Sequence, residues 1–151
     1  MKISLVSVGV RRGRGKRVLE DALTKDYLSR ADRYVRVEGS WMEGVAEFWA
    51  AVEQAPGRTP ARVILMDSAG QLRTSMEFAE VIRDFRDRGS QRVIVGIGGA
   101  DGWDLESRKK ADLVLSIGPW TLPHGLARVV VAEQIYRALT ILAGHPYHCG
   151  H

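Results

Sequence analysis

The residues best suited to chemistry gather near the end of the chain. The segment 144–151 holds three of the four histidines and the single cysteine, Cys149. Tyr147 and His148 could serve as a general base or as contacts to RNA. Histidine and cysteine also bind metals, but no second pair of ligands is visible upstream, so we expect no metal site. A terminus without a functional role fits the same residues equally well.

A glycine-rich loop is a second candidate for binding. Residues 96–102 read Gly-Ile-Gly-Gly-Ala-Asp-Gly, so a ligand could press directly on the backbone there. As a dinucleotide-binding fingerprint the loop fails, because it does not read G-x-G-x-x-G and no acidic residue follows at the expected distance. A tight strand-to-helix turn with positive φ at one or two glycines is an equally good interpretation.

A stiff loop lies over residues 116–124, where two prolines and one glycine occur among nine residues. Its backbone donors and acceptors could recognise the edge of an adenine. The alternative is an ordinary turn in which Thr121 caps the next helix and Pro123 occupies the first helical turn. His124 by itself is better explained as a capping or packing residue than as a catalyst.

The elements that must position these loops alternate along the chain. Short apolar runs predict buried strands, and segments with helical spacing lie between them. We expect strands at 2–10, 34–38, 63–66, 92–97 and 113–117, and helices at 18–29, 41–52, from Thr74 or Ser75 to 86, 105–110 and 123–143. The helix at 41–52 carries a capping-box signal from Ser40 and Glu43, and its Trp41 and Trp49 are expected in the core.

This alternation indicates the α/β class, with a mostly parallel sheet and helices on both faces. In such sheets ligands bind beyond the carboxyl ends of the strands. The loops 67–70, 98–102 and 118–123 all follow strands, so we expect them to converge at one edge. Trp103 and Trp120, which lie in these loops, could wall a pocket there.

Composition and charge limit the class of protein. The chain has 151 residues, 45% hydrophobic and 26% charged, which fits a single domain over 1–151 and excludes a coiled coil or a fibre. The single cysteine suits the cytoplasm, and the apolar run 3–10 is too short to span a membrane.

The positive charge is concentrated near the start of the chain. The net charge is 22 − 18 = +4, and residues 1–17 contain six basic residues and no acid, Arg11, Arg12 and Arg14 among them. Arginine favours bidentate contacts to phosphate, so this basic cluster could bind a polyanion. A basic loop that only aids solubility is equally consistent with the charge alone.

Several segments together resemble a known family. They are Val63–Gly70 (VILMDSAG), Thr74–Ala79 (TSMEFA), Ile97–Gly102 (IGGADG), Thr121–His124 (TLPH), Glu133–Ala138 (EQIYRA) and Pro146–His148 (PYH). In this order they resemble the small bacterial methyltransferases of the SPOUT class, which modify N3 of a pseudouridine in large-subunit ribosomal RNA. The resemblance covers the whole chain and is most specific over residues 63–148.

The resemblance implies a fold with a deep trefoil knot near the C-terminus and a homodimer with the last helix at its interface. It implies S-adenosylmethionine as cofactor and helix 69 of 23S ribosomal RNA, on the assembled ribosome, as substrate. The cofactor-binding residues carried over by position are Met66, Gly98, Ile117, Gly118, Pro119, Trp120, Thr121 and Leu122. The tail would help to complete the active site.

The chemistry of this reaction suggests catalytic roles. N3 of pseudouridine is an imide that must lose its proton, so a base or a donor that stabilises the anion would help. The candidates are His148 and Tyr147, with Arg137 positioning the base or a phosphate and His124 as a second choice. Three positions depart from the family pattern: Cys149 replaces a basic residue, Gln71 replaces a lysine, and Trp120 is bulkier than expected.

Two other interpretations belong to different classes. The first is an RNA-binding module that kept the fold but lost catalysis, which Cys149 in the tail would make plausible. The second is a Rossmann-type enzyme that binds a nucleotide or nicotinamide, which the glycine pattern disfavours.

Overall fold

The computed structural model describes residues 1–9, 18–54 and 59–149. Its described part contains one five-stranded sheet in which all neighbouring strands are parallel, in the order β2-β1-β4-β3-β5. The elements are β1 (Lys2–Val8), α1 (Val18–Ala31), β2 (Arg36–Met42), α2 (Val45–Gln54), β3 (Arg62–Gln71), α3 (Ser75–Asp87), β4 (Arg92–Ile97), α4 (Leu105–Lys110), β5 (Leu113–Leu115) and α5 (His124–Leu142). The predicted α/β class with a parallel sheet is therefore confirmed.

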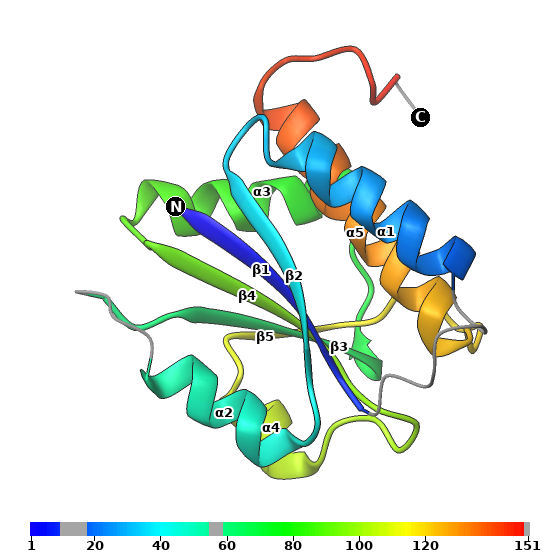
Figure 1. Cartoon of the computed structure of the whole chain (residues 1–151). Coiled ribbons are helices and arrows are strands. Elements are labelled where there is room, and N and C mark those ends of the chain that lie inside the picture. Colours follow the sequence, from blue (N-terminus) through cyan, green and yellow to red (C-terminus); the bar gives the residue numbers. More distant parts are fainter. Residues whose placement is uncertain (10–17, 55–58, 150–151) are drawn as a thin grey trace.

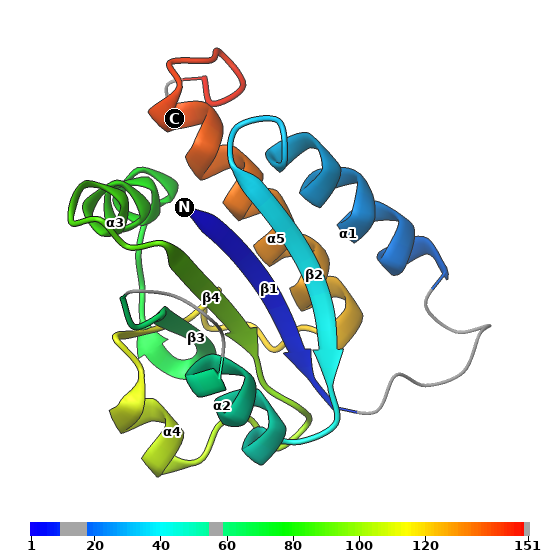
Figure 2. The ribbon, with the colours of Figure 1, turned by 60° about the vertical axis from the view of Figure 1, so that its left-hand side comes forward.

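Helices cover both faces of the sheet. Helices α1, α3 and α5 lie on one face and α2 and α4 on the other (Figure 1). Strand β1 shows why, because its side chains alternate between the faces. Ile3 and Leu5 join the core under α1, α3 and α5, whereas Val6 and Val8 pack with Phe48 of α2. Figure 2 shows the same layers from another side.

The segment around Trp41 folds differently from the expected helix at 41–52. Trp41 belongs to β2 and pairs with Ser7 of β1, and α2 begins only at Val45. The capping-box prediction for Ser40 is wrong as well, since Ser40 pairs with Val6 in the sheet. Seven residues of parallel pairing to β1 outweigh the local helical spacing, as tertiary context commonly does.

Strand β3 is longer than expected, and its last residues lie close against the end of β5. Residues 67–70 continue β3 and do not form a separate turn, although Asp67 Oδ1 accepts a hydrogen bond from the Ala69 amide at 2.9 Å. Gln71 pairs with Leu115, and the Ser116 amide donates to the Gln71 carbonyl at 2.9 Å. A Cβ at Gly70 would lie 2.7 Å from the Leu115 backbone nitrogen, so only glycine permits this approach.

The start of α3 agrees with the sequence. Thr74 is its N-cap, and its hydroxyl accepts from the Glu77 amide at 3.1 Å while the Glu77 carboxylate accepts from the Thr74 amide at 2.7 Å. This reciprocal capping box fixes where the chain turns from β3 into α3.

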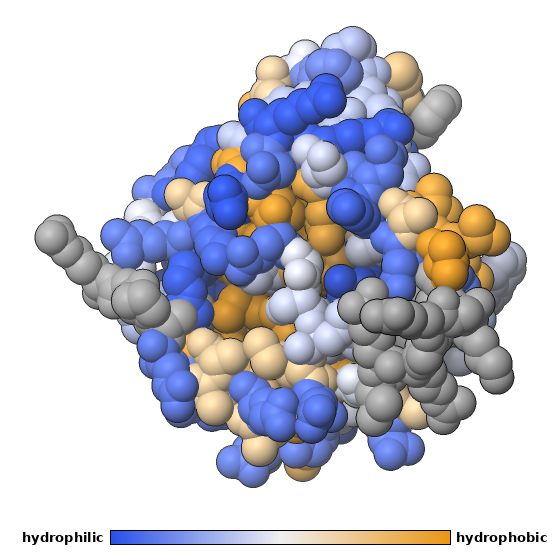
Figure 3. Space-filling model, in the orientation of Figure 1, coloured by the Kyte–Doolittle hydropathy of each residue, from blue (hydrophilic) through white to orange (hydrophobic). Residues whose placement is uncertain are grey.

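An apolar surface lies on the outer side of α1 near its first turn. Val18, Leu19 and Leu23 are 62%, 78% and 48% exposed. We call these three residues the α1 apolar patch, and the orange side chains over α1 at the right of Figure 3 belong to this region. Across the ranges that the structure describes, no helix is both long and apolar enough to cross a membrane.

Candidate active site

The last part of β3 and the loops after β4 and β5 converge at one edge of the sheet, where three loops are predicted to meet. Together they line one hollow of about 870 Å³. This volume lies in the range of small-molecule sites. We call it the loop hollow.

Most of the predicted cofactor residues line the loop hollow. Those that do are Met66, Gly98, Ile117, Gly118, Trp120, Thr121 and Leu122. Pro119 is the member of the predicted set that is absent from the lining. The side chain of Trp120 is 85% exposed, so its bulk is turned toward solvent and does not fill the hollow.

Trp103 closes one wall of the loop hollow and is only 4% exposed. Its amide donates to Asp67 Oδ2 at 3.2 Å, and its indole Nε1 donates to the Met66 carbonyl at 3.1 Å. These two bonds join the glycine loop to β3. The expectation that Trp103 walls a pocket is therefore confirmed.

The glycine loop is a tight turn that also faces the loop hollow. Gly102 has φ +70°, which confirms that a glycine here needs positive φ. A Cβ at Gly98 would lie 3.1 Å from the Gly102 carbonyl carbon and 3.1 Å from Trp103 Nε1. The lack of side chains thus keeps the loop folded and leaves its backbone facing the hollow.

The third loop leads into α5 without the predicted cap. Pro123 is the N-cap and supplies no side-chain hydrogen bond, so the assignment of Thr121 as cap is wrong. Proline has a fixed φ that suits this entry into a helix. His124 begins α5, lines the loop hollow and packs against Trp41, with ring centroids 5.3 Å apart. Its packing role is thereby confirmed.

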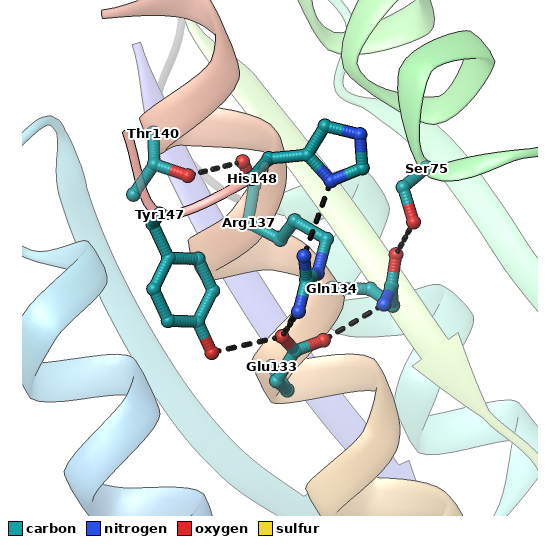
Figure 4. Close-up of polar contacts among 7 residues, drawn as sticks. All are labelled: Ser75, Glu133, Gln134, Arg137, Thr140, Tyr147 and His148. Carbon is teal, nitrogen blue, oxygen red and sulfur yellow. Dashed lines mark hydrogen bonds and ion pairs between the residues drawn. The ribbon is translucent and has the colours of Figure 1, made fainter. Parts of the chain in front are cut away.

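The tail folds back onto α5 and brings the predicted catalytic residues together (Figure 4). Arg137 Nη1 lies 3.1 Å from His148 Nδ1, and Arg137 Nη2 lies 2.7 Å from Glu133 Oε1. The Tyr147 hydroxyl donates to the same Glu133 oxygen at 3.0 Å. The four residues form one connected group, which we call the tail cluster.

Glu133 is the member of the tail cluster that the sequence reasoning did not single out as functional. Its second oxygen, Oε2, accepts from Gln134 at 2.7 Å, and Gln134 in turn accepts from the Ser75 hydroxyl at 2.7 Å. The carboxylate thus links α5 both to the tail and to α3. The signal that could have found it is the Glu133–Arg137 spacing of four residues on one helix face.

The surroundings of Tyr147 and Arg137 in the tail cluster favour the protonated form of each side chain. Burial, followed by the hydrogen bond to Glu133, raises the pKa of Tyr147 to about 12. The hydrogen bond to Glu133 also raises the pKa of Arg137. Both groups therefore keep their protons at neutral pH, so the Tyr147 hydroxyl lies in the cluster as a neutral hydrogen-bond donor.

The contact to Arg137 defines the tautomer of His148. A guanidinium can only donate hydrogen bonds, so Nδ1 of His148 must accept. In the neutral imidazole the proton is then on Nε2, which makes that nitrogen a donor toward any bound group.

The tail is also anchored by packing. The ring of Tyr147 lies 4.7 Å from that of Tyr136, and the Arg137 guanidinium lies 4.8 Å from the Tyr147 ring centroid. The rings of Tyr27 and Tyr34 also lie near that of Tyr136, with centroids 6.2 and 6.3 Å away. The tail up to Cys149 is thus an ordered part of the fold, which disfavours the interpretation as a functionless terminus.

The loop hollow adjoins the start of α5, whereas the tail cluster includes Glu133 and Arg137 from its middle and second half. His124 lines the hollow, and Arg137 follows it by 13 residues on the same helix. At about 1.5 Å of rise per residue the two are roughly 20 Å apart along the helix axis. Within one chain, the structure therefore does not bring the predicted cofactor residues and catalytic residues together.

Two further predictions concern a basic patch and a metal. Arg11, Arg12 and Arg14 lie outside the described residues. Among the residues that are described, no group of three or more His, Cys, Asp and Glu side chains is arranged to hold a metal ion.

The family model described as "Predicted SPOUT methyltransferase" matches residues 1–148. The chain therefore belongs to the SPOUT methyltransferase family. A protein of Koribacter versatilis (strain Ellin345) named ribosomal RNA large subunit methyltransferase H is 45% identical over 151 residues, all of both chains. A protein of the same name from Methylobacterium sp. (strain 4-46) is 42% identical over 99% of both chains. Within the SPOUT class, the chain belongs to the ribosomal RNA large subunit methyltransferase H family.

Solved structures support the fold. A probable methylase family protein from Haemophilus influenzae Rd KW20 matches with a TM-score of 0.55 at 12% identity, over 94% of this chain and 66% of that one. The SpoU methyltransferase AviRb from Streptomyces viridochromogenes was solved in complex with the cofactor AdoMet. It matches with a TM-score of 0.52 at 12% identity, over 95% of this chain and 59% of that one. The chain thus spans about 59–66% of the length of these solved chains, and the likeness concerns the fold alone.

Proposed function

We propose that this protein transfers a methyl group from S-adenosylmethionine to N3 of a pseudouridine in helix 69 of 23S ribosomal RNA, on the assembled ribosome. The observation that carries the proposal is the 45% identity, over the full length of both chains, to a ribosomal RNA large subunit methyltransferase H. The loop hollow and the tail cluster supply the two kinds of group that such a reaction needs, a cofactor site and hydrogen-bond donors for an anion.

The loop hollow fits S-adenosylmethionine. It is large enough for a small molecule, and glycine backbone faces it where a Cβ at Gly98 would meet Gly102 and Trp103. Met66, Gly98 and the segment 117–122 would hold the cofactor, which supplies an activated methyl group when bound. Backbone donors and acceptors of the third loop would recognise the adenine.

The tail cluster would act on the RNA base. Arg137 is positively charged, and His148 Nε2 is a donor because Nδ1 accepts from Arg137. Together they would stabilise the imide anion that N3 forms when its proton passes to solvent. Tyr147, whose pKa is raised to about 12, would position Glu133 and hence Arg137, and would not remove the proton.

A homodimer would bring the loop hollow of one chain next to the tail cluster of the other. The α1 apolar patch leaves Val18, Leu19 and Leu23 exposed, which is typical of a surface that another chain covers. Because the hollow adjoins the start of α5 and the tail cluster lies further along it, a second chain running antiparallel would bring its tail cluster to the first chain's hollow. We propose that α5 and α1 contribute to this interface.

The finer features of the fold belong to the same proposal. A trefoil knot near the C-terminus is supported by the close crossing of Gly70 by Leu115, from which the chain continues into α5. We also propose a single domain over residues 1–151, an RNA-binding role for Arg11, Arg12 and Arg14, and a location in the cytoplasm, where ribosomes are found.

Methyl transfer to ribosomes that lack the modification tests the function. We expect labelled methyl to appear in large-subunit RNA from the unmodified ribosomes and not from modified ones. Ribosome binding without transfer would support the non-catalytic RNA-binding module instead. Calorimetry separates the Rossmann-type alternative, which predicts binding of a nicotinamide nucleotide and none of S-adenosylmethionine.

A further inference from the structure

Arg108 of α4 lines the loop hollow, and its Nε makes no hydrogen bond, although its charge acts on the carboxylate of Asp104 in the preceding turn. Four arginines of the described part are not exposed, and the other three have hydrogen bonds: Arg92 to the Val52 carbonyl, Arg128 to Ser7 and Arg137 to Glu133. The Nε of Arg108 is buried without a hydrogen-bond partner, and no ion pair of its guanidinium occurs among the described residues. A buried donor without an acceptor is costly, so an acceptor supplied by a ligand is the expected resolution.

The charges around the loop hollow indicate what that ligand carries. Asp67 and Asp101 line the hollow together with Arg108 and give it two formal negative charges and one positive charge. The oxygens of Asp67 accept from the amides of Ala69 and Trp103, and no ion pair joins Asp67 to Arg108 among the described residues. S-adenosylmethionine is complementary, because its sulfonium and ammonium are positive and its single carboxylate is negative.

We propose that Arg108 binds the α-carboxylate of S-adenosylmethionine, and that it is a binding residue for the cofactor in addition to the three loops. This inference rests on the proposed function, since it assigns one end of the proposed cofactor to one side chain. A guanidinium presents paired N–H donors that match the two oxygens of a carboxylate.

A phosphate of the RNA is the competing acceptor, and the location of Arg108 argues against it. Arg108 lines the same hollow as the glycine loop and β3, which are proposed cofactor-binding elements. The carboxylate is therefore the better match.

Calorimetry on the full-length protein tests the assignment. Arg108→Met keeps the length of the side chain and removes the charge. We expect the substitution to weaken the binding of S-adenosylmethionine and of S-adenosylhomocysteine by the same factor, about tenfold or more, since both compounds carry the carboxylate. Binding of 5′-methylthioadenosine and of decarboxylated S-adenosylmethionine, which lack it, should be unchanged. Lys109→Ala, an exposed basic residue on the same helix that does not line the hollow, is the matched control.

The outcomes separate this inference from the proposed function. If wild-type protein binds none of these compounds, the proposed function fails. The assignment of Arg108 is overturned if wild type and Arg108→Met bind S-adenosylmethionine equally well. It is also overturned if the variant loses as much affinity for 5′-methylthioadenosine as for S-adenosylmethionine. Unchanged cofactor affinity with a raised KM for ribosomes would assign Arg108 to an RNA phosphate instead. If Arg108→Met does not fold, Arg108→Lys takes its place. It should bind the two compounds with a carboxylate more weakly than wild type does, and the two compounds without a carboxylate equally well.

Discussion

The Tyr147 hydroxyl donates a hydrogen bond of 3.0 Å to Glu133 Oε1, the oxygen that also accepts from Arg137 at 2.7 Å. This shared oxygen ties the tail to α5 and holds two donors on one carboxylate. Burial and this bond both favour the protonated form of the phenol and raise its pKa.

The first prediction concerns the ionisation of Tyr147. With its pKa raised to about 12 from 10.0, the phenol stays protonated in the folded state while it ionises in the unfolded one. Its contribution to stability should be present below pH 10 and be lost as the pH rises to about 12. Absorbance titration of wild type and Tyr147→Phe should show that the component lost in the variant titrates near the upper value. A lost component that titrates near pH 10 would contradict the role of burial and Glu133.

The second prediction separates a donor from a base at His148. The amide of glutamine can place a donor near the position of Nε2, whereas that of asparagine mimics Nδ1. If Nε2 donates to the imide anion, His148→Gln should retain more methyl transfer than His148→Asn, and both should bind S-adenosylmethionine as wild type does. Single-turnover rates check this. Equal and complete loss in both variants would favour a base at His148.

Another pair of variants tests whether the tail takes part in methyl transfer at all. His148→Ala and Tyr147→Phe should each lower the rate of methylation, by about tenfold or more, with unchanged cofactor binding. Normal methylation by both variants would show that the tail cluster is not catalytic. Cys149→Arg, which restores the basic residue of the family pattern, is a useful companion because it tests whether this position contacts RNA.

How far the sequence predicts this structure depends on the kind of signal. Strand 92–97 and helix 105–110 have the predicted bounds, because a continuous apolar run and a clear cap at Asp104 define them locally. The segment around Trp41 could not be predicted, since its pairing partner in β1 lies 34 residues away in the sequence. Local helical spacing says nothing about that partner.

The candidate site shows the same limits. Convergence of the loops follows from a general property of parallel sheets, so the loop hollow was predictable. The Glu133–Arg137 pair could have been predicted from its spacing of four residues, whereas the Tyr147–Glu133 hydrogen bond and the unpaired Nε of Arg108 depend on how the tail and α4 pack. The resemblance to a family supplied the roles of Tyr147 and His148, which spacing alone left open.

The third prediction concerns the basic cluster. Neutralising Arg11, Arg12 and Arg14 together should weaken ribosome binding and reduce its dependence on salt, because fewer counterions are released from the RNA. Affinity for S-adenosylmethionine should stay the same. Binding measured across a series of salt concentrations checks this, and an unchanged salt slope would return the cluster to a role in solubility.

The fourth prediction tests the chain crossing at Gly70. A Cβ at this position would meet the backbone of Leu115, which cannot move aside without breaking the pairing of β3 with β5. Gly70→Ala should therefore lower the free energy of unfolding by about 1–3 kcal/mol. Gly99→Ala is the matched control, because its nearest contact would be an ordinary 3.5 Å to the Val8 carbonyl. Equal stability of the two variants in denaturant titrations would contradict the crossing.

Mixed dimers provide the most direct test of the central claim, that the hollow of one chain works with the tail cluster of another. Gly98→Val should block cofactor binding and His148→Ala should disable the tail, so each variant alone should be inactive in methyl transfer to unmodified ribosomes. After the two are unfolded and refolded together, random pairing makes half of the dimers mixed, each with one intact site of two, so we expect about a quarter of wild-type activity. No recovery of activity, although mixed dimers are shown to form, would contradict the composite site.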